Sequence, residues 1–253
     1  MIPSVELHGW LVALVFLLAP IAITLLVFIS APYGRHIREG WGPRVPGRLG
    51  WIVMESPAVL LFGAVFFTGA RSLDVVPLVL LSLWMLHYIH RTFIFPFRLR
   101  STKPMPVLVA GLAFGYQSLN AVVNAAWIGD FGAYPVAWLW DPRFLLGIAL
   151  FLLGTVINHH ADWVLLNLRK PGETGYKIPR GGMYRWVTAA NYFGEIVIWV
   201  GWAVATWSLA GLSFAVFTAA NLAPRAAQNH TWYHEKFGSA YPSERRRLIP
   251  FLW

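Results

Sequence analysis

The chain alternates long apolar runs with short polar segments, and most of the runs are long enough to cross a bilayer as a helix. A membrane-spanning helix needs about 20 consecutive, largely apolar residues. Pro and Gly residues between the runs mark the breaks. The pattern therefore predicts seven spans, which cover residues 8–30, 51–70, 73–95, 106–128, 143–167, 190–208 and 211–235.

The composition indicates an integral membrane protein. Of the 253 residues, 57% are hydrophobic and 12% are charged, against about 25% charged in an average soluble domain. No polar stretch is long enough for a separate soluble domain, so residues 1–253 are expected to form one domain. The expected fold class is all-α: a polytopic bundle of seven transmembrane helices that encloses a cavity. The absence of cysteine excludes disulfides, Cys-ligated metals and thiol catalysis.

The distribution of Lys and Arg predicts the orientation of the bundle. Loops with four or five of these residues alternate with loops that have one or none. Basic loops are expected in the cytoplasm, which places the N-terminus outside and the C-terminus in the cytoplasm. The first span follows Glu6 and no basic residue, so we expect an uncleaved helix. The net charge of +9 is explained by this topology and by an anionic ligand, and nucleic acid is not expected as a partner.

Polar side chains recur inside the predicted spans, where an ionisable group is costly unless it is paired or faces water. They fall at helical spacing and at the predicted cytoplasmic ends of their spans. They are Glu55, Tyr88, the Asn158–Asp162–Arg169 set that begins the segment INHHADWVLLNLRKPGETGYKIP, the Asn191–Glu195 pair, and the Arg225–Asn229–Tyr233 set. Such a pattern indicates a cavity open to the cytoplasm that holds a large anionic ligand, and a phosphorylated cofactor fits.

Metal binding is a rival interpretation of the histidines. His87-x-x-His90, His159-His160 and His230-x-x-x-His234 faintly resemble the clusters that hold two irons in membrane desaturases. Those enzymes need more histidines in denser motifs, so no metal site is predicted. The chain also lacks a Gly-rich dinucleotide fingerprint and a phosphate-binding loop, so a nucleotide would bind without a Rossmann unit.

Four long motifs resemble the steroid 5α-reductases (3-oxo-5α-steroid 4-dehydrogenases). They are LHYIHRTFIFPF, INHHADWVLLNLRKPGE, the run LRKPGETGYKIPRGGMYRWVTAANYFGEIVIWVGWAVATWSLAG, and the tail YPSERRRLIPFLW. The likeness covers at least residues 50–253. A bacterial member of the family is expected, since the chain is compact and carries no retention signal; its membrane would be the bacterial inner membrane, or the endoplasmic reticulum in a eukaryote.

The resemblance implies a seven-helix fold that encloses NADPH and reduces the 4,5 double bond of a 3-oxo-4-ene steroid. By motif, Glu55 and Tyr88 would face the substrate ketone as catalytic residues, with Arg91 beside them. The implied cofactor-binding residues are Asn158, Asp162, Arg169, Tyr176, Asn191, Glu195, Arg225, Asn229 and Tyr233. The implied partners are a steroid or another lipophilic enone and the lipid bilayer, with no protein partner.

The chain departs from the mammalian family pattern at two places. Met54 precedes Glu55 where the steroid enzymes have Gln, and Ala110-Gly111 stands where they have Arg before Gly. Because of these two departures, the resemblance does not identify the exact substrate. The alternatives are an enone reductase of the same fold acting on enoyl-CoA or polyprenyl substrates, a membrane methyltransferase of the isoprenylcysteine type, and a transporter or receptor without enzymatic activity.

Overall fold

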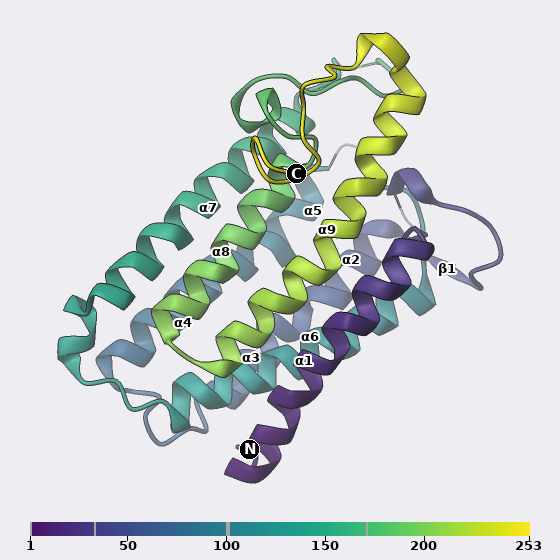
Figure 1. Cartoon of the computed structure of the whole chain (residues 1–253). Helices are drawn as coiled ribbons and strands as arrows, with labels where there is room; N and C mark the ends of the chain where they lie inside the picture. Colours follow the sequence, from purple (N-terminus) through teal and green to yellow (C-terminus); the bar gives the residue numbers. More distant parts are fainter. Residues whose placement is uncertain (1, 33, 100–101, 171) are drawn as a thin grey trace.

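The structure is a computed structural model that describes residues 2–32, 34–99, 102–170 and 172–253. Long helices run side by side, and the C-terminus lies among loops at the end of the bundle opposite the N-terminus (Figure 1). The helices are α1 (Val5–Phe28), α2 (Gly47–Glu55), α3 (Leu60–Phe66), α4 (Val75–Ile89), α5 (Phe95–Arg98), α6 (Val107–Ala126), α7 (Pro142–Leu166), α8 (Ala190–Thr206) and α9 (Leu209–Phe237). The described strands are β1 (Arg44–Val45) and β2 (Met105–Pro106), which pair antiparallel.

The all-α, polytopic membrane organisation is confirmed. Five helical segments of the described chain are long and apolar enough to cross a membrane. They are Val5–Phe28, Gly47–Phe66, Val75–Arg98, Val107–Phe131 and Pro142–Leu166. The predicted count of seven is not confirmed, because α8 has 17 residues and the second half of α9 is polar. Both are nevertheless helices of the bundle.

Two of the predicted spans are interrupted, and each interruption lies beside a predicted site residue. The segment Gly47–Phe66 changes after Glu55 into a 3-10 turn, Ser56–Ala58, which contains Pro57. Helix α4 passes into a π-helical turn, His90–Ile94, which contains Arg91, and α5 follows with Pro96 near its start. Proline has no N–H for the helical ladder, and π-helical turns are frequent at functional sites.

Glycines bring the backbones of α7 and α8 into contact. A Cβ on Gly154 would lie 2.5 Å from the backbone nitrogen of Ile198, and a Cβ on Gly194 would lie 2.5 Å from that of Asn158. Both distances are too short for any residue other than glycine. We call these positions, together with Gly147 and Gly201, the glycine seam. The seam holds the polar residues of α7 against those of α8.

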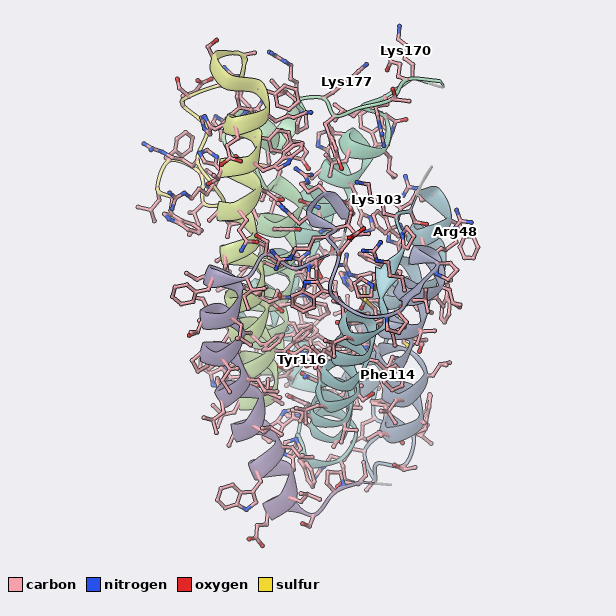
Figure 2. All side chains as sticks on the ribbon, turned by 90° about the vertical axis from the view of Figure 1, so that its right-hand side faces the viewer. Arg48, Lys103, Phe114, Tyr116, Lys170 and Lys177 are labelled. Carbon is pink, nitrogen blue, oxygen red and sulfur yellow. The ribbon has the colours of Figure 1, made fainter. Side chains whose placement is uncertain are left out.

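Basic side chains gather at one end of the molecule. Arg48, Lys103, Lys170 and Lys177 lie in the half of the bundle that carries the long loops, while Phe114 and Tyr116 lie nearer its middle (Figure 2). The helices between the two ends expose many large apolar side chains, including Leu145, Leu152 and Val156. An apolar belt below a basic end suits a protein embedded in a bilayer.

Candidate active site

A cavity of about 780 Å³ lies inside the bundle. Sites for small molecules are commonly about 300–1,000 Å³. Apolar side chains of α1, α6 and α9 form part of its lining, among them Leu25, Leu112 and Phe214. Polar residues of α2, α4, α6, α7, α8 and α9 also line it, so the cavity can hold a molecule with both apolar and charged parts.

One wall of the cavity is a hydrogen-bonded set on α7 and α8. Asn158 Nδ2 donates to the backbone oxygen of Asn191 at 2.9 Å and to Glu195 Oε2 at 3.0 Å. Asn191 Nδ2 donates in turn to Asp162 Oδ1 at 3.2 Å. The close approach at the glycine seam is what allows these short side chains to meet across two helices. Trp199 Nε1 donates to Glu195 Oε1 at 2.8 Å.

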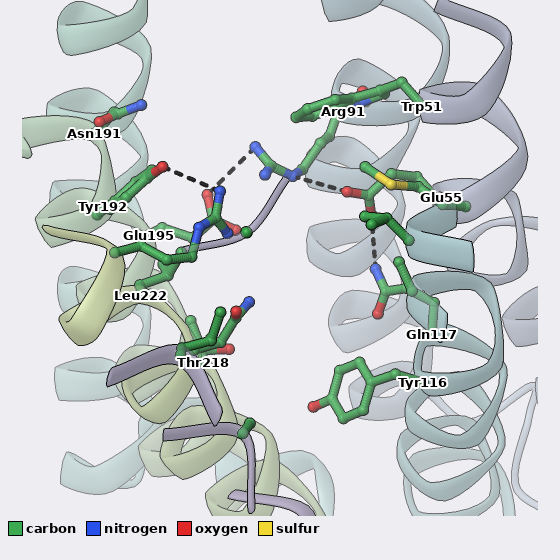
Figure 3. A pocket seen from close by; sticks show the side chains of 18 of the residues that line it. Trp51, Glu55, Arg91, Tyr116, Gln117, Asn191, Tyr192, Glu195, Thr218 and Leu222 are labelled. Atoms are coloured by element: carbon green, nitrogen blue, oxygen red, sulfur yellow. Dashed lines mark hydrogen bonds and ion pairs between the residues drawn. The ribbon is translucent and has the colours of Figure 1, made fainter. Parts of the chain in front are cut away.

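Arg91 spans the cavity between this wall and α2. Its Nε lies 3.5 Å from Glu55 Oε1, and its Nη1 lies 3.7 Å from Glu195 Oε2. Figure 3 shows the guanidinium between the two carboxylates, with Trp51 beside it. The guanidinium carbon lies 5.2 Å from the centre of the Trp51 ring, within the range of a cation–π contact.

The π-helical turn also explains how Trp51 fixes Arg91. Phe95 N donates to His90 O, so the Arg91 carbonyl has no partner there, and the next candidate, Pro96, has no N–H. The indole Nε1 of Trp51 donates to this carbonyl at 3.0 Å. The broken helical ladder thus leaves a backbone acceptor that ties α2 to α4 at the site.

Glu55 and Tyr88 meet through a third residue, Gln117 of α6. Gln117 Nε2 donates to Glu55 Oε2 at 2.7 Å and to the Tyr88 hydroxyl oxygen at 3.2 Å. All three side chains line the cavity and are buried, with Tyr88 only 2% exposed. The Tyr88 ring also packs on Trp199 with ring centres 5.5 Å apart. The result is a phenol held in one orientation beside a carboxyl group.

A second, smaller cavity of about 130 Å³ shares Ala31, Tyr192 and Arg225 with the first. His36 and Asn229 line it, and their Nε2 and Oδ1 atoms are 3.2 Å apart. Arg225 Nη2 donates to the Tyr192 hydroxyl at 3.1 Å. Burial, together with Arg35 and Arg225 nearby, lowers the pKa of His36 below its usual value of 6.5. The small cavity therefore combines cationic groups with hydrogen-bond donors, which suits an anionic group.

Arg35 lies over three aromatic rings next to the small cavity. Its guanidinium carbon is 5.8 Å from the ring centre of Tyr176, 4.9 Å from Trp232 and 5.0 Å from Tyr233. Its Nη1 is buried and has no hydrogen-bond partner within the described residues. A buried guanidinium nitrogen without a partner is costly, so this atom is suited to an anionic ligand.

The structure brings most of the predicted site residues together. Those that line the large cavity are Glu55, Tyr88, Arg91, Asn158, Asp162, Arg169, Asn191, Glu195 and Arg225. Asn229 lines the small cavity instead, and Tyr176 and Tyr233 lie against Arg35. The helical-face prediction for Arg169 is wrong, because α7 ends at Leu166; Arg169 reaches the cavity from the following loop, where its Nη1 donates to Gly175 O at 3.3 Å.

Sequence reasoning missed several residues of the site. Gln117 is a single Gln in an apolar run and has no polar neighbour at helical spacing within the predicted site. Arg35 and His36 precede the predicted cavity segments; the sequence singles out Arg35 only as a loop charge and does not single out His36. His87 was considered only as a metal ligand, whereas its Nε2 lies 3.3 Å from Glu195 Oε1. A buried amide in a span was the one available signal for Gln117.

Four of the histidines pack in two pairs. His90 packs on His159 with ring centres 4.4 Å apart, and His230 lies 4.6 Å from His234 by the same measure. In the part of the chain that the structure describes, no three His, Asp or Glu side chains gather as metal ligands would.

Comparison with known proteins gives one consistent family. Residues 103–253 match the family model described as 3-oxo-5-alpha-steroid 4-dehydrogenase. The chain is 46% identical to 3-oxo-5-alpha-steroid 4-dehydrogenase 1 of Bos taurus over 239 residues, with 93% of each chain covered. It is 44% identical to the Rattus norvegicus protein of that name over 259 residues, with 100% of each covered.

A plant relative gives the same result. The chain is 43% identical to steroid 5-alpha-reductase DET2 of Arabidopsis thaliana over 251 residues, which covers 96% of this chain and 95% of the relative. The similarity therefore extends through every helix that lines the cavity and confirms the resemblance stated from the motifs. The chain belongs to the 3-oxo-5-alpha-steroid 4-dehydrogenase (steroid 5-alpha-reductase) family and is an oxidoreductase that acts on CH–CH bonds.

Proposed function

We propose that this protein uses NADPH to reduce the 4,5 double bond of 3-oxo-4-ene steroids, giving 5α-reduced 3-oxo steroids. The observation that carries the proposal is the arrangement of Glu55, Gln117 and Tyr88 at an apolar part of the cavity, opposite the polar wall of α7 and α8. In this arrangement the Tyr88 hydroxyl can donate a hydrogen bond to a substrate ketone. The amides and cations on the opposite side of the cavity can bind a nucleotide. The steroid names of the relatives support this substrate class.

The residues present fit a phosphorylated dinucleotide. Asn158, Asp162 and Asn191 offer amide and carboxylate groups suited to the amide and ribose parts, and Arg169 and Arg225 offer guanidinium groups suited to phosphates. The small cavity adds the buried Nη1 of Arg35, which has no partner in the described chain. In this proposal, Asn229, Tyr176 and Tyr233 surround the same phosphorylated end of the cofactor.

Tyr88 stabilises charge that develops on the substrate. When bound, NADPH supplies the hydride that the β-carbon of the enone accepts. As that carbon gains the hydride, the C=C electron pair shifts toward the ketone oxygen, which becomes an enolate oxygen. The Tyr88 hydroxyl donates a hydrogen bond to this oxygen, and the α-carbon then takes a proton from the site or from water. A donor aimed at the developing charge stabilises the transition state more than the ground state.

The proposal also covers the orientation of the protein in the membrane and the route by which the substrate enters. The single domain lies with its N-terminus outside and its C-terminus in the cytoplasm, so the basic end and the small cavity open to cytoplasmic NADPH. The apolar ketone enters from the bilayer, where it partitions, and reaches the apolar part of the cavity lined by Leu25, Leu112 and Phe214.

The direct test uses the protein purified in detergent with NADPH and testosterone or progesterone. We expect one NADPH oxidised for each 5α-reduced product formed, identified by mass and by comparison with both 5-epimers. Oxidation of NADPH by an enoyl-CoA or polyprenal but not by either steroid would assign the alternative enone reductase. No NADPH binding by the folded protein would overturn the proposal.

A further inference from the structure

Gln117 connects the carboxyl group of Glu55 to the phenol of Tyr88. Its amide nitrogen is 2.7 Å from Glu55 Oε2 and 3.2 Å from the Tyr88 hydroxyl oxygen, and it donates to both. Its amide oxygen, Oε1, is buried and has no hydrogen-bond partner in the part of the chain that the structure describes. Met54, the residue before Glu55, lies in an apolar cluster and cannot donate a hydrogen bond. The amide beside Glu55 therefore comes from Gln117 of α6 and not from α2.

The surroundings of Glu55 decide which way the amide points. Arg91 Nε lies 3.5 Å from Glu55 Oε1, on the side away from the Gln117 contact with Oε2. A carboxylate beside a guanidinium accepts hydrogen bonds and donates none. The nitrogen of Gln117 must therefore face Glu55, because the opposite orientation would set two acceptors against each other.

This orientation determines where the Tyr88 proton goes. A phenol has one O–H donor, and its oxygen can also accept. Because Gln117 donates to the Tyr88 oxygen, the Tyr88 proton is not used toward Gln117 and remains for an acceptor elsewhere. Tyr88 lines the cavity, so a substrate oxygen in the cavity can take this bond. Hydrogen bonds in such a chain also strengthen one another.

We infer that Gln117 is a positioning residue that fixes Tyr88 as a hydrogen-bond donor to the substrate ketone, through a chain that runs from Arg91 to Glu55, Gln117 and Tyr88. The inference rests on the proposed function, since it requires Tyr88 to donate to a ketone. Gln117 itself does not touch the reacting atoms.

The test is a double-mutant cycle between Gln117→Met and Tyr88→Phe, read out in kcat, in substrate KM and in NADPH affinity. Met has the length of Gln and no donor, so Gln117→Met is expected to lower kcat about 10- to 100-fold, with NADPH affinity unchanged. In the Tyr88→Phe background, the same substitution should cost less than about threefold, because the group that it positions is gone. An equal loss in both backgrounds, or no loss at all, overturns the inference.

Gln117→Glu tests the donor count in a variant of nearly the same shape. An amide has two N–H donors, whereas a carboxyl group next to Glu55 has at most one, and Tyr88 would turn its proton toward the new oxygen. We expect a loss in kcat at least as large as with Met. Wild-type turnover in this variant would show that polarity alone is required and would overturn the inference.

Ser118→Ala is the matched control on the same helix. Ser118 Oγ donates to Phe114 O at 2.8 Å, and Ser118 is not among the residues that line the cavity. Its kcat should equal that of the wild type. If Tyr88→Phe alone leaves kcat unchanged, the proposed role of Tyr88 fails, and the inference with it. If Tyr88→Phe lowers kcat and Gln117→Met does not, only the inference fails.

Discussion

Arg91 Nε lies 3.5 Å from Glu55 Oε1, so the cation of the π-helical turn stands directly beside the carboxylate at the end of α2. The same guanidinium lies 3.7 Å from Glu195 Oε2. Removing it leaves two buried carboxylates without their cation, which typically costs about 3–5 kcal/mol for a buried pair. We predict that Arg91→Met lowers the Tm by on the order of 10 °C in a detergent melt.

The control for this prediction is Arg98→Met. Arg98 is exposed and its Nη1 lies 3.4 Å from His90 Nε2, so its loss leaves no buried carboxylate unpaired. The Tm of the control should stay within about 2 °C of the wild type, as for most surface substitutions. Equal Tm values for the two variants would contradict the assigned role of Arg91.

Glu55→Gln and Tyr88→Phe are predicted to lower kcat and to leave cofactor binding intact. Tyr88→Phe removes a donor to a developing oxyanion, a loss that typically costs about 100- to 1,000-fold. Glu55→Gln removes the carboxylate that accepts from Gln117 and so disturbs the orientation of Tyr88. Glu55 lies on the side of the cavity away from the α7–α8 wall (Figure 3), and the Tyr88 hydroxyl is held by Gln117 of α6, so NADPH affinity should change less than about threefold. Single-turnover reduction and quenching of Trp fluorescence by NADPH measure the two properties. Near-normal rates for both variants would remove them from catalysis.

Arg169→Ala and Arg225→Ala are predicted to weaken NADPH binding. A hydrogen bond to a charged group contributes about 1.5–3 kcal/mol, so each loss should raise the Kd about 10- to 150-fold. If Arg225 faces the 2′-phosphate, Arg225→Ala will also reduce the preference for NADPH over NADH. Titration of each variant with both nucleotides measures this, and an unchanged Kd would exclude the residue as a phosphate ligand.

The affinity for NADPH is predicted to depend on His36. Burial and nearby arginines lower the pKa of His36, so in the protein without cofactor this side chain is mostly neutral at pH 7. A bound phosphate offsets those positive charges and raises this pKa, so binding takes up a proton and the affinity rises as the pH falls from about 8 to 6. His36→Gln should remove the part of the pH dependence of NADPH affinity that comes from His36. The part that comes from titration of the phosphate itself remains in both the wild type and the variant. Identical pH profiles would contradict the placement of phosphate at His36.

Substitution in the glycine seam is predicted to damage both stability and cofactor binding. Gly194→Ala would place a Cβ 2.5 Å from the backbone nitrogen of Asn158, and backbone atoms cannot yield without moving α7 from α8. Overpacking of this kind typically costs about 1–3 kcal/mol. The 3.0 Å bond from Asn158 to Glu195 would lengthen, so NADPH affinity should fall with the Tm.

Gly115→Ala is the matched control for the seam. Gly115 is also helical, but a Cβ there meets nothing within 4 Å. Alanine favours a helix over glycine by roughly 1 kcal/mol, so the Tm of this variant should stay level or rise. A loss of Tm equal to that of Gly194→Ala would show that the effect of the seam is not one of close packing.

The sequence predicted the helices well because apolar length is a strong and local signal. All seven predicted spans correspond to helical segments, with ends that differ by about four residues or fewer. The breaks beside Glu55 and Arg91 were not predicted. Pro57 and Pro96 mark both places, but whether a helix bends, widens or ends at a proline depends on neighbours such as Trp51, which the local pattern does not contain.

The site was predicted where polar residues recur at helical spacing or lie in motifs, and was missed elsewhere. Asn158 and Glu195 follow from such patterns. Gln117 does not, because its partners Glu55 and Tyr88 lie 62 and 29 residues away and meet it only after three helices pack. Arg35 depends in the same way on Tyr176 and Tyr233. Contacts between distant segments decide these roles.

The glycine seam also limits how the substrate range of this fold can be changed. Two helices in backbone contact cannot move relative to each other to widen the cavity, so a bulkier ketone has to be accommodated elsewhere. Leu25 and Leu112 face the cavity from α1 and α6 with side chains that can be shortened without moving a helix. Selection for new substrates in the laboratory is therefore expected to accumulate changes on α1 and α6 and to leave the α7–α8 pair untouched.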